Sequence, residues 1–293
     1  MTYLVQQIVN GLSNGLIYAG LALALVLVFH GSGILNIAQG QLATFSAFLA
    51  WTLTTYGVPW PLIVIGVVAV SFVLGATVER VLIRPIEGGN ALNFLVATLA
   101  LLLLINATIG TLWGYLPQSV PSPFGDGVLR MGEIVISAHQ IGTAAVLGGS
   151  LALVAALFRY TTVGLRMRAA TENAESARLL GVSVSRMLAF GWGLAAAMGA
   201  VVGMLAAPTL GLDTTIFFNA MLYAFAAVTL GGLTSMAGSV VGGLVLGLAQ
   251  TLSAAYIPFI GSDLNVVVPF LLILAVLLVR PSGLFGRETS GRV

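Results

Sequence analysis

Few side chains in this sequence are capable of chemistry, and their types exclude most reactions. All 11 basic residues among the 293 are arginine, and neither lysine nor cysteine occurs. Schiff bases, lysine general bases, P-loop phosphate binding, thiolate nucleophiles, disulfides and cysteine-ligated metals are therefore excluded. The two histidines, His30 and His139, lie far apart without paired carboxylates, so we expect no metal site. Adjacent Ser/His, His/Glu or Asp/Asp pairs of catalytic spacing are also missing, which argues against an intramembrane enzyme.

The remaining polar groups are amides and hydroxyls, which suit a permeation path, although each is also a common helix–helix hydrogen-bonding group. Asn36 is the leading candidate, because Gly31 and Gly33 can break a helix and turn a positive helix start toward a carboxylate. Ionisable residues are nearly absent from the apolar segments, which argues against a proton- or sodium-coupled carrier. The predicted path residues are Asn14, Asn36, Gln39, Gln41 and Asn219.

The elements that position these groups are membrane-spanning helices. The chain is 59% hydrophobic and 7% charged, with a mean hydropathy of +1.08, whereas soluble domains are about a quarter charged. Its apolar runs approach the ~20 residues that cross a bilayer as helix. We predict one all-α, polytopic transmembrane domain over 1–293. The expected number of spans is about nine, within a range of eight to ten: 8–29, 41–56, 61–79, 91–112, 139–158, 188–208, 219–233, 239–257 and 265–279.

Glycines leave two of these spans open to another interpretation. Gly231 and Gly232 in one, and the glycines at 238, 242, 243 and 247 in the other, could mark a broken or re-entrant helix. Irregular backbone at membrane depth is tolerated only where protein or water covers it. A faint internal similarity relates residues 14–19 to residues 219–224, although composition alone could produce it.

Arginine positions predict the orientation. They cluster at 80–84, 159–186 and 280–292, with Arg130 apart from the clusters. By the positive-inside rule the clusters are cytoplasmic, so the loop 113–138 is external, the segment 159–187 is internal and the N-terminus is outside. If residues 30–40 re-enter, the N-terminus moves inside. No removable signal peptide is expected at the start of the chain. In the external loop, β-branched residues around a glycine indicate a small hairpin over 127–136, which could be a partner surface or a lid.

A short helix is predicted inside the internal segment. Asn173 can cap it and Gly181 can end it, with Glu175 in the first turn and Arg178 in the last, as the helix dipole favours. A helix of about seven residues needs packing to be stable. The apolar stripe available for packing is Ala174, Ala177 and Leu180. From the residues alone, this stripe could rest on the chain's own bundle or on a partner.

Several motifs together resemble the branched-chain amino acid permeases of bacterial ATP-binding-cassette importers, specifically their H-type subunit. They lie at 33–41, 162–169, 177–182, 230–232 with 238–239, and 280–286, so the resemblance covers nearly the whole chain. It implies that the internal segment sits on ATPase subunits. The implied coupling residues are Gly164, Arg166, Arg168, Glu172, Glu175, Arg178, Leu179, Leu180 and Gly181. The family often has a glutamate at the position of Gln41, so this neutral amide leaves the solute open.

The resemblance further implies a non-enzymatic transport subunit in the bacterial inner membrane. Its partners would be a second homologous permease subunit or a second copy of this chain, two ATP-binding subunits, an external solute-binding protein and membrane lipid. ATP and Mg would bind those ATPase subunits, and this chain would carry no cofactor. With a net charge of +2, we expect no nucleic-acid partner. A urea or short-amide importer permease of the same family, or a self-sufficient channel or secondary carrier, remain alternatives.

Overall fold

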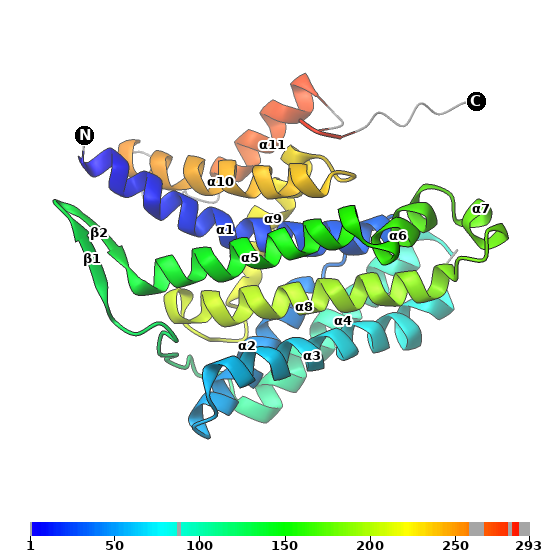
Figure 1. The fold of residues 1–293 in the computed structure, drawn as a ribbon, viewed down its shortest axis with the longest axis horizontal. Helices are drawn as coiled ribbons and strands as arrows, with labels where there is room; N and C mark the ends of the chain where they lie inside the picture. The colour runs from blue at the N-terminus through cyan, green and yellow to red at the C-terminus, as the bar shows by residue number, and fades with distance from the viewer. Residues whose placement is uncertain (1, 87–88, 258–266, 281–282, 287–293) are drawn as a thin grey trace. The chain divides into compact units, whose positions relative to one another are not determined.

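The structure, a computed structural model, describes residues 2–86, 89–257, 267–280 and 283–286, and it is helical except for one hairpin (Figure 1). The elements in chain order are α1 (Thr2–Ser32), α2 (Gln39–Thr55), α3 (Trp60–Val78), the π-helical η1 (Glu79–Ile83), the 3-10 helix η2 (Arg84–Ile86), α4 (Ala91–Trp113), β1 (Val128–Met131), β2 (Ile134–Ser137), α5 (Ala138–Tyr160), α6 (Thr162–Glu172), α7 (Ala174–Leu179), α8 (Val184–Leu210), α9 (Phe217–Gly231), α10 (Met236–Tyr256) and α11 (Val267–Val279). The predicted all-α fold is confirmed.

Each predicted span falls on one of the apolar helices α1–α5 and α8–α11. Within the described residues, six helices are long and apolar enough to cross a membrane: α1, α3 continued to Ile86, α4, α5, α8 and α10. The other three, α2, α9 and α11, have 17, 15 and 13 residues. At about 1.5 Å per residue, α9 covers roughly 20–25 Å, less than the ~30 Å hydrocarbon core. Around Gly231 and Gly232, where the sequence allowed a broken or re-entrant helix, the structure has two helices, α9 and α10, that end and begin at Gly231 and Met236.

The helices form two compact units, one comprising 1–26, 124–147 and 218–293, and the other 27–123 and 148–217. In the second unit α8 is the central helix, and both α2 and α3 pack against it. Gly203 of α8 lies so close to the carbonyl of Ala43 that a Cβ there would collide with it. The hydroxyls of Ser46 and Ser71 are 2.8 Å apart, which links α2 to α3. Small residues thus bring the backbones together, as in membrane helix pairs generally.

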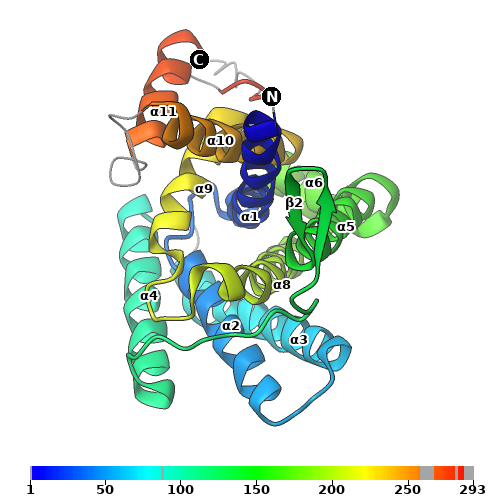
Figure 2. The ribbon, with the colours of Figure 1, turned by 90° about the vertical axis from the view of Figure 1, so that its left-hand side faces the viewer.

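In the first unit, α10 carries two rows of glycine on different faces. Gly243 and Gly247 meet α1 at Ala19 and Gly15, and Gly238 and Gly242 meet α9 at Gly231 and Ala227. In α1, a Cβ on Gly15 would lie 2.9 Å from the Cα of Leu244. Figure 2 shows α1, α9 and α10 close together. The glycines therefore serve close helix contact, and α10 holds a different neighbour on each row.

The predicted hairpin is confirmed and is tied to α1. β1 and β2 are antiparallel with Arg130 opposite Val135, and the turn between them contains Gly132 at φ 66°. The Gln6 side chain accepts a hydrogen bond from the Val135 N–H and donates one to the Val135 carbonyl, both at 2.9 Å. This amide acts as a neighbouring strand would, so the hairpin has a fixed place on α1.

A glycine also ends α1, at the helix break that the sequence predicted. α1 ends at Ser32, and Gly33 follows with φ 70°, a left-handed conformation that glycine adopts without strain.

Of the predicted cytoplasmic arginines, Arg287 and Arg292 lie outside the described residues, as does the beginning of the span predicted over 265–279.

Candidate functional site

Residues 159–187, which the arginines predict to be cytoplasmic, fold into two capped helices, α6 and α7. The Asn173 side chain accepts a hydrogen bond from the Ser176 N–H at 2.9 Å, and Gly181 follows α7 with φ 80°, so both predicted caps are confirmed. The sequence analysis missed α6. Its signal was Thr161, whose hydroxyl accepts from the Gly164 N–H at 3.1 Å and caps that helix.

One face of α7 is anchored on its own chain. Ala177 is 2% exposed and packs with Ala170 of α6 and with Val184 and Leu188 of α8. The predicted stripe was wrong at Leu180, which is 82% exposed. The physical reason is that α7 ends at Leu179, so Leu180 leaves the helical face that Ala177 occupies.

The other face of this segment is open. Leu179 is 86% exposed next to Leu180. The five charged residues that the resemblance assigned to coupling are all exposed: Arg166, Arg168, Glu172, Glu175 and Arg178. Gly164 is instead buried in the first turn of α6, where a Cβ would lie 2.5 Å from the Cα of Phe158 in α5. The segment thus presents an apolar pair within a charged surface, on a turn that its own packing fixes.

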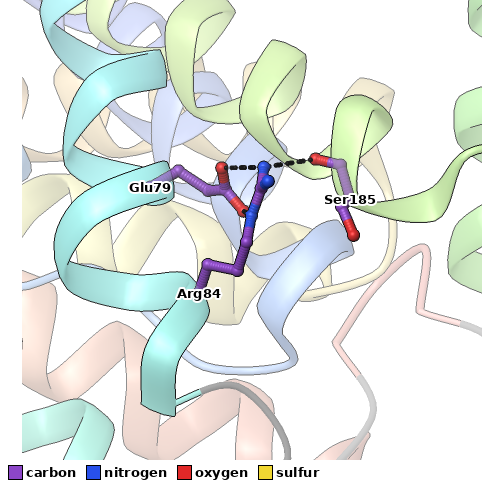
Figure 3. Close-up of polar contacts among 3 residues, drawn as sticks. All are labelled: Glu79, Arg84 and Ser185. Atoms are coloured by element: carbon purple, nitrogen blue, oxygen red, sulfur yellow. Dashed lines mark hydrogen bonds and ion pairs between the residues drawn. The ribbon is translucent and has the colours of Figure 1, made fainter.

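An ion pair fixes the start of α8, the helix that follows this segment. Glu79 is 1% exposed and binds Arg84 through both carboxylate oxygens, at 3.2 and 2.8 Å. The same guanidinium donates to the carbonyl of Ser185, in the first turn of α8, at 3.1 Å (Figure 3). Arg84 therefore joins the end of the helical run α3–η1 to the first turn of α8, which follows residues 159–187.

Three of the predicted path residues lie at the start of α2. Asn36 is fully buried, and its side-chain oxygen accepts from the Ala38 N–H at 3.0 Å. Gln39 is also buried and donates to the Ala195 carbonyl of α8 at 2.9 Å. Gln41 donates to the Thr214 carbonyl at 3.0 Å, while its own oxygen is buried without a donor in the described part of the chain. Asn36 and Gln39 therefore fix the turn before α2, and Gln41 keeps an open acceptor.

The other two predicted path residues, Asn14 and Asn219, belong to the first unit. Both are exposed, on α1 and α9 respectively. Tyr18 and Tyr223 lie four residues further along these two helices, and their rings are stacked with centroids 4.7 Å apart. These tyrosines occupy matching positions in the two similar hexapeptides, and their contact was not predicted.

The described residues contain no group of three or more His, Asp or Glu side chains that could hold a metal ion. His139 is 8% exposed, with its Nε2 3.3 Å from the Thr143 hydroxyl. This histidine thus has a hydrogen-bonding partner on its own helix.

The family model described as "Branched-chain amino acid transport system / permease component" matches residues 7–277. The chain belongs to this family. This permease is a transport subunit rather than an enzyme, and it is a multi-pass membrane protein.

Individual relatives match this permease almost from end to end. It is 30% identical to the high-affinity branched-chain amino acid transport system permease protein LivH of Escherichia coli, covering 99% of this chain and 98% of LivH. It is 32% identical to the corresponding protein BraD of Pseudomonas aeruginosa, covering 98% of this chain and 97% of BraD.

A solved structure shares the permease's fold. PsaBC from Streptococcus pneumoniae in complex with Fab matches with a TM-score of 0.52 over 93% of this chain and 91% of that one. The sequence identity is 15%, so this likeness concerns the fold alone.

Proposed function

We propose that this permease forms the membrane path of an ATP-driven importer for branched-chain or similarly small amino acids in a bacterial inner membrane. Its proposed partners are two ATP-binding subunits, a second permease subunit or a second copy of this chain, and an external solute-binding protein. ATP and Mg would bind the ATPase subunits. LivH and BraD are permease proteins of branched-chain amino acid transport systems, which supports branched-chain amino acids over urea or short amides as the solute.

The observation that carries the proposal is the exposed pair Leu179 and Leu180 on an anchored turn. Burying one leucine side chain is worth about 1.5–3 kcal/mol, so leaving two exposed side by side gives up a substantial stabilisation. The contact between α7 and the rest of the chain is made by Ala177, which lies on the opposite face of the helix. A partner with an apolar groove and acidic or basic rims would cover the leucines and meet the surrounding arginines and glutamates. An ATPase subunit docked at the cytoplasmic side fits this surface.

Changing Leu179 and Leu180 to aspartate tests the docking. Desolvating even one unpaired charge in a packed contact costs several kcal/mol, so the ATPase subunits should no longer co-purify with the double variant. Expression and membrane insertion should be normal, because both side chains lie outside the packed face of α7. The measurement is the amount of ATPase recovered with the permease at matched membrane levels, together with leucine uptake.

The matched control adds the same charge at exposed polar positions, Thr171→Asp with Ser176→Asp. The control should retain both the ATPase and uptake. Equal recovery of the ATPase with the leucine variant and with unmutated protein would show that this turn is a free surface loop.

The alternative class, a self-sufficient channel or carrier, would move solute without partner subunits, whereas the proposed importer depends on them. The proposed importer requires that the purified chain alone neither hydrolyses ATP nor moves solute, because the sequence lacks a phosphate-binding glycine-lysine loop. Leucine accumulation by proteoliposomes that contain this chain only would establish the carrier and contradict the importer.

A further inference from the structure

The connection between α8 and α9 is an irregular segment that runs inside the helix packing. We call residues 211–216 the outer strap. Within it, Leu212 is fully buried and Thr214 is 7% exposed. The first turn of α8 follows residues 159–187, and its 27 residues span about 40 Å, so the strap lies at the opposite end of that helix. The arginine positions predict this end to be the outer one.

Two side-chain amides meet at one carbonyl of the outer strap. Gln41 of α2 and Asn106 of α4 each donate a hydrogen bond to the Thr214 carbonyl, both at 3.0 Å. Asn106 precedes Trp113, the last residue of α4, by about two turns, so this carbonyl lies roughly 10 Å short of the end of that helix. Irregular backbone at such a depth is tolerated only where its polar groups are covered. A carbonyl oxygen has two lone pairs, and the two amides occupy both.

The outer strap is also paired with the loop that follows α4. The Gln118 N–H donates to the Leu212 carbonyl at 2.8 Å, and the Leu212 N–H donates to the Gln118 carbonyl at 3.1 Å. These bonds and the two amide contacts all lie within the second unit. The bonds are all neutral, and a neutral hydrogen bond contributes only modestly in net terms because water can replace it. Docking of a partner can therefore supply the free energy that breaks them.

The attached strap leaves one polar atom unsatisfied. The Oε1 atom of Gln41 is buried and accepts no hydrogen bond from any residue that the structure describes. Leaving an acceptor buried without a donor is unfavourable. Release of the strap would let this oxygen meet water, so part of the stability of the attached state is lost at Gln41 itself.

Local structure allows the outer strap to move as a unit. Pro208 lies in the last turn of α8 and has no N–H to donate to the Met204 carbonyl, which weakens that turn. Gly211 ends the helix with φ 77°. Inside the strap, the Asp213 carboxylate accepts hydrogen bonds from the Thr215 N–H at 2.6 Å and from its hydroxyl at 2.8 Å. The strap therefore keeps its own turn when its contacts with α2 and α4 are broken.

The outer strap is attached to the polar residues predicted to line the solute path. Gln41 belongs to that group together with Asn36 and Gln39, which are both 0% exposed. Solvent does not reach these two side chains in the structure. We propose that the outer strap is a gate that closes the solute path at the outer side, and that transport requires release of Thr214 from Gln41 and Asn106. The inference rests on the proposed importer function and adds where its path is shut.

A disulfide across the strap tests whether release is needed. In this cysteine-free chain, Gln118→Cys with Leu212→Cys places two thiols on paired residues. Antiparallel partners that exchange both hydrogen bonds have Cα atoms about 5.5 Å apart, which is within disulfide range. Oxidation of this pair in the assembled transporter should stop leucine uptake, and a reductant should restore it.

The matched control places a disulfide in the hairpin. Leu129→Cys with Ile136→Cys joins register partners of β1 and β2, at a distance from the strap along the chain. Its oxidation should leave leucine uptake unchanged. In both variants, the loss of thiols that react with maleimide measures how much disulfide has formed.

A labelling rate measures release of the strap directly. Thr214→Cys places a thiol on the strap where the native side chain is 7% exposed, so a water-soluble maleimide should react with it mainly after release. In this background Asn106→Leu removes one of the two donors at similar side-chain size. The labelling rate of the purified permease should rise about tenfold, the factor expected for net loss of one hydrogen bond. Asn93→Leu, at an exposed asparagine of the same helix, is the matched control and should not change the rate.

The two measurements separate the gate from the importer proposal, because labelling requires neither solute nor partner subunits. If the unmutated transporter takes up no leucine while the labelling rate still responds to Asn106→Leu, the importer proposal fails and the releasable strap stands. Three results would each refute the gate. These are normal leucine uptake with the Gln118→Cys and Leu212→Cys pair fully oxidised, an unchanged labelling rate in Asn106→Leu, and a cysteine pair that does not oxidise.

Discussion

The ion pair between Glu79 and Arg84 predicts an asymmetric response to mutation. Arg84→Ala leaves a carboxylate that is 1% exposed without its bidentate partner. Breaking a buried pair from one side costs about 3–5 kcal/mol. Glu79→Gln leaves instead a guanidinium that is 33% exposed, can reach water and still binds the Ser185 carbonyl. Its cost should be about 1 kcal/mol, the scale of a partly exposed pair.

The double variant Glu79→Gln with Arg84→Ala sharpens the test. It removes the buried charge together with its partner, so it should be more stable than Arg84→Ala alone. For a large domain 1 kcal/mol shifts the thermal midpoint by roughly 2–4 °C, so Arg84→Ala should lower it by roughly 6–20 °C and Glu79→Gln by a few degrees. The assay is thermal unfolding of the purified permease in detergent at a fixed scan rate.

Two outcomes would refute this reasoning. Equal losses for Glu79→Gln and Arg84→Ala would mean that burial of the carboxylate does not control the cost. A double variant less stable than Arg84→Ala would mean that Glu79 contributes through contacts other than this pair.

Three further predictions follow from local geometry. Gly247→Ala should destabilise the permease by about 1–3 kcal/mol, since the new Cβ collides with the backbone of Gly15, while Gly148→Ala, which meets nothing within 4 Å, should be neutral in the same thermal assay. Asn173→Ala should weaken the start of α7 by about 0.5–2 kcal/mol, seen as faster amide hydrogen exchange there. In this cysteine-free chain, an impermeant thiol reagent applied to intact cells should label Glu133→Cys and spare Ser176→Cys, and the reverse pattern would invert the orientation.

Local signals made much of this fold predictable. The cap and stop of α7 depend on residues adjacent to it, and the β1–β2 hairpin depends on a glycine turn between β-branched residues, so both could be predicted directly from the sequence. The positions of the apolar helices follow from the length of hydrophobic runs, because the bilayer sets that length.

Features that depend on tertiary contact or unusual backbone were not predictable. Glu79 and Arg84 are five residues apart, which places them on different faces of an α-helix, and the π-helical turn η1 brings them together. Likewise, the glycines of α10 indicated close packing but not which row meets α1 and which meets α9. The stacking of Tyr18 on Tyr223 also required knowledge of which helices are neighbours.

The amide of Gln6 has a consequence for how strands could add to this protein. An unpaired strand edge invites pairing with another chain. On the free edge of β2, the N–H and carbonyl of Val135 are occupied by Gln6, and the N–H of Ser137 is occupied by the Gln140 side chain at 3.0 Å. Strand addition by a partner, or edge-to-edge aggregation between copies, would have to displace these side chains at β2. β1 is therefore the edge through which such pairing would begin.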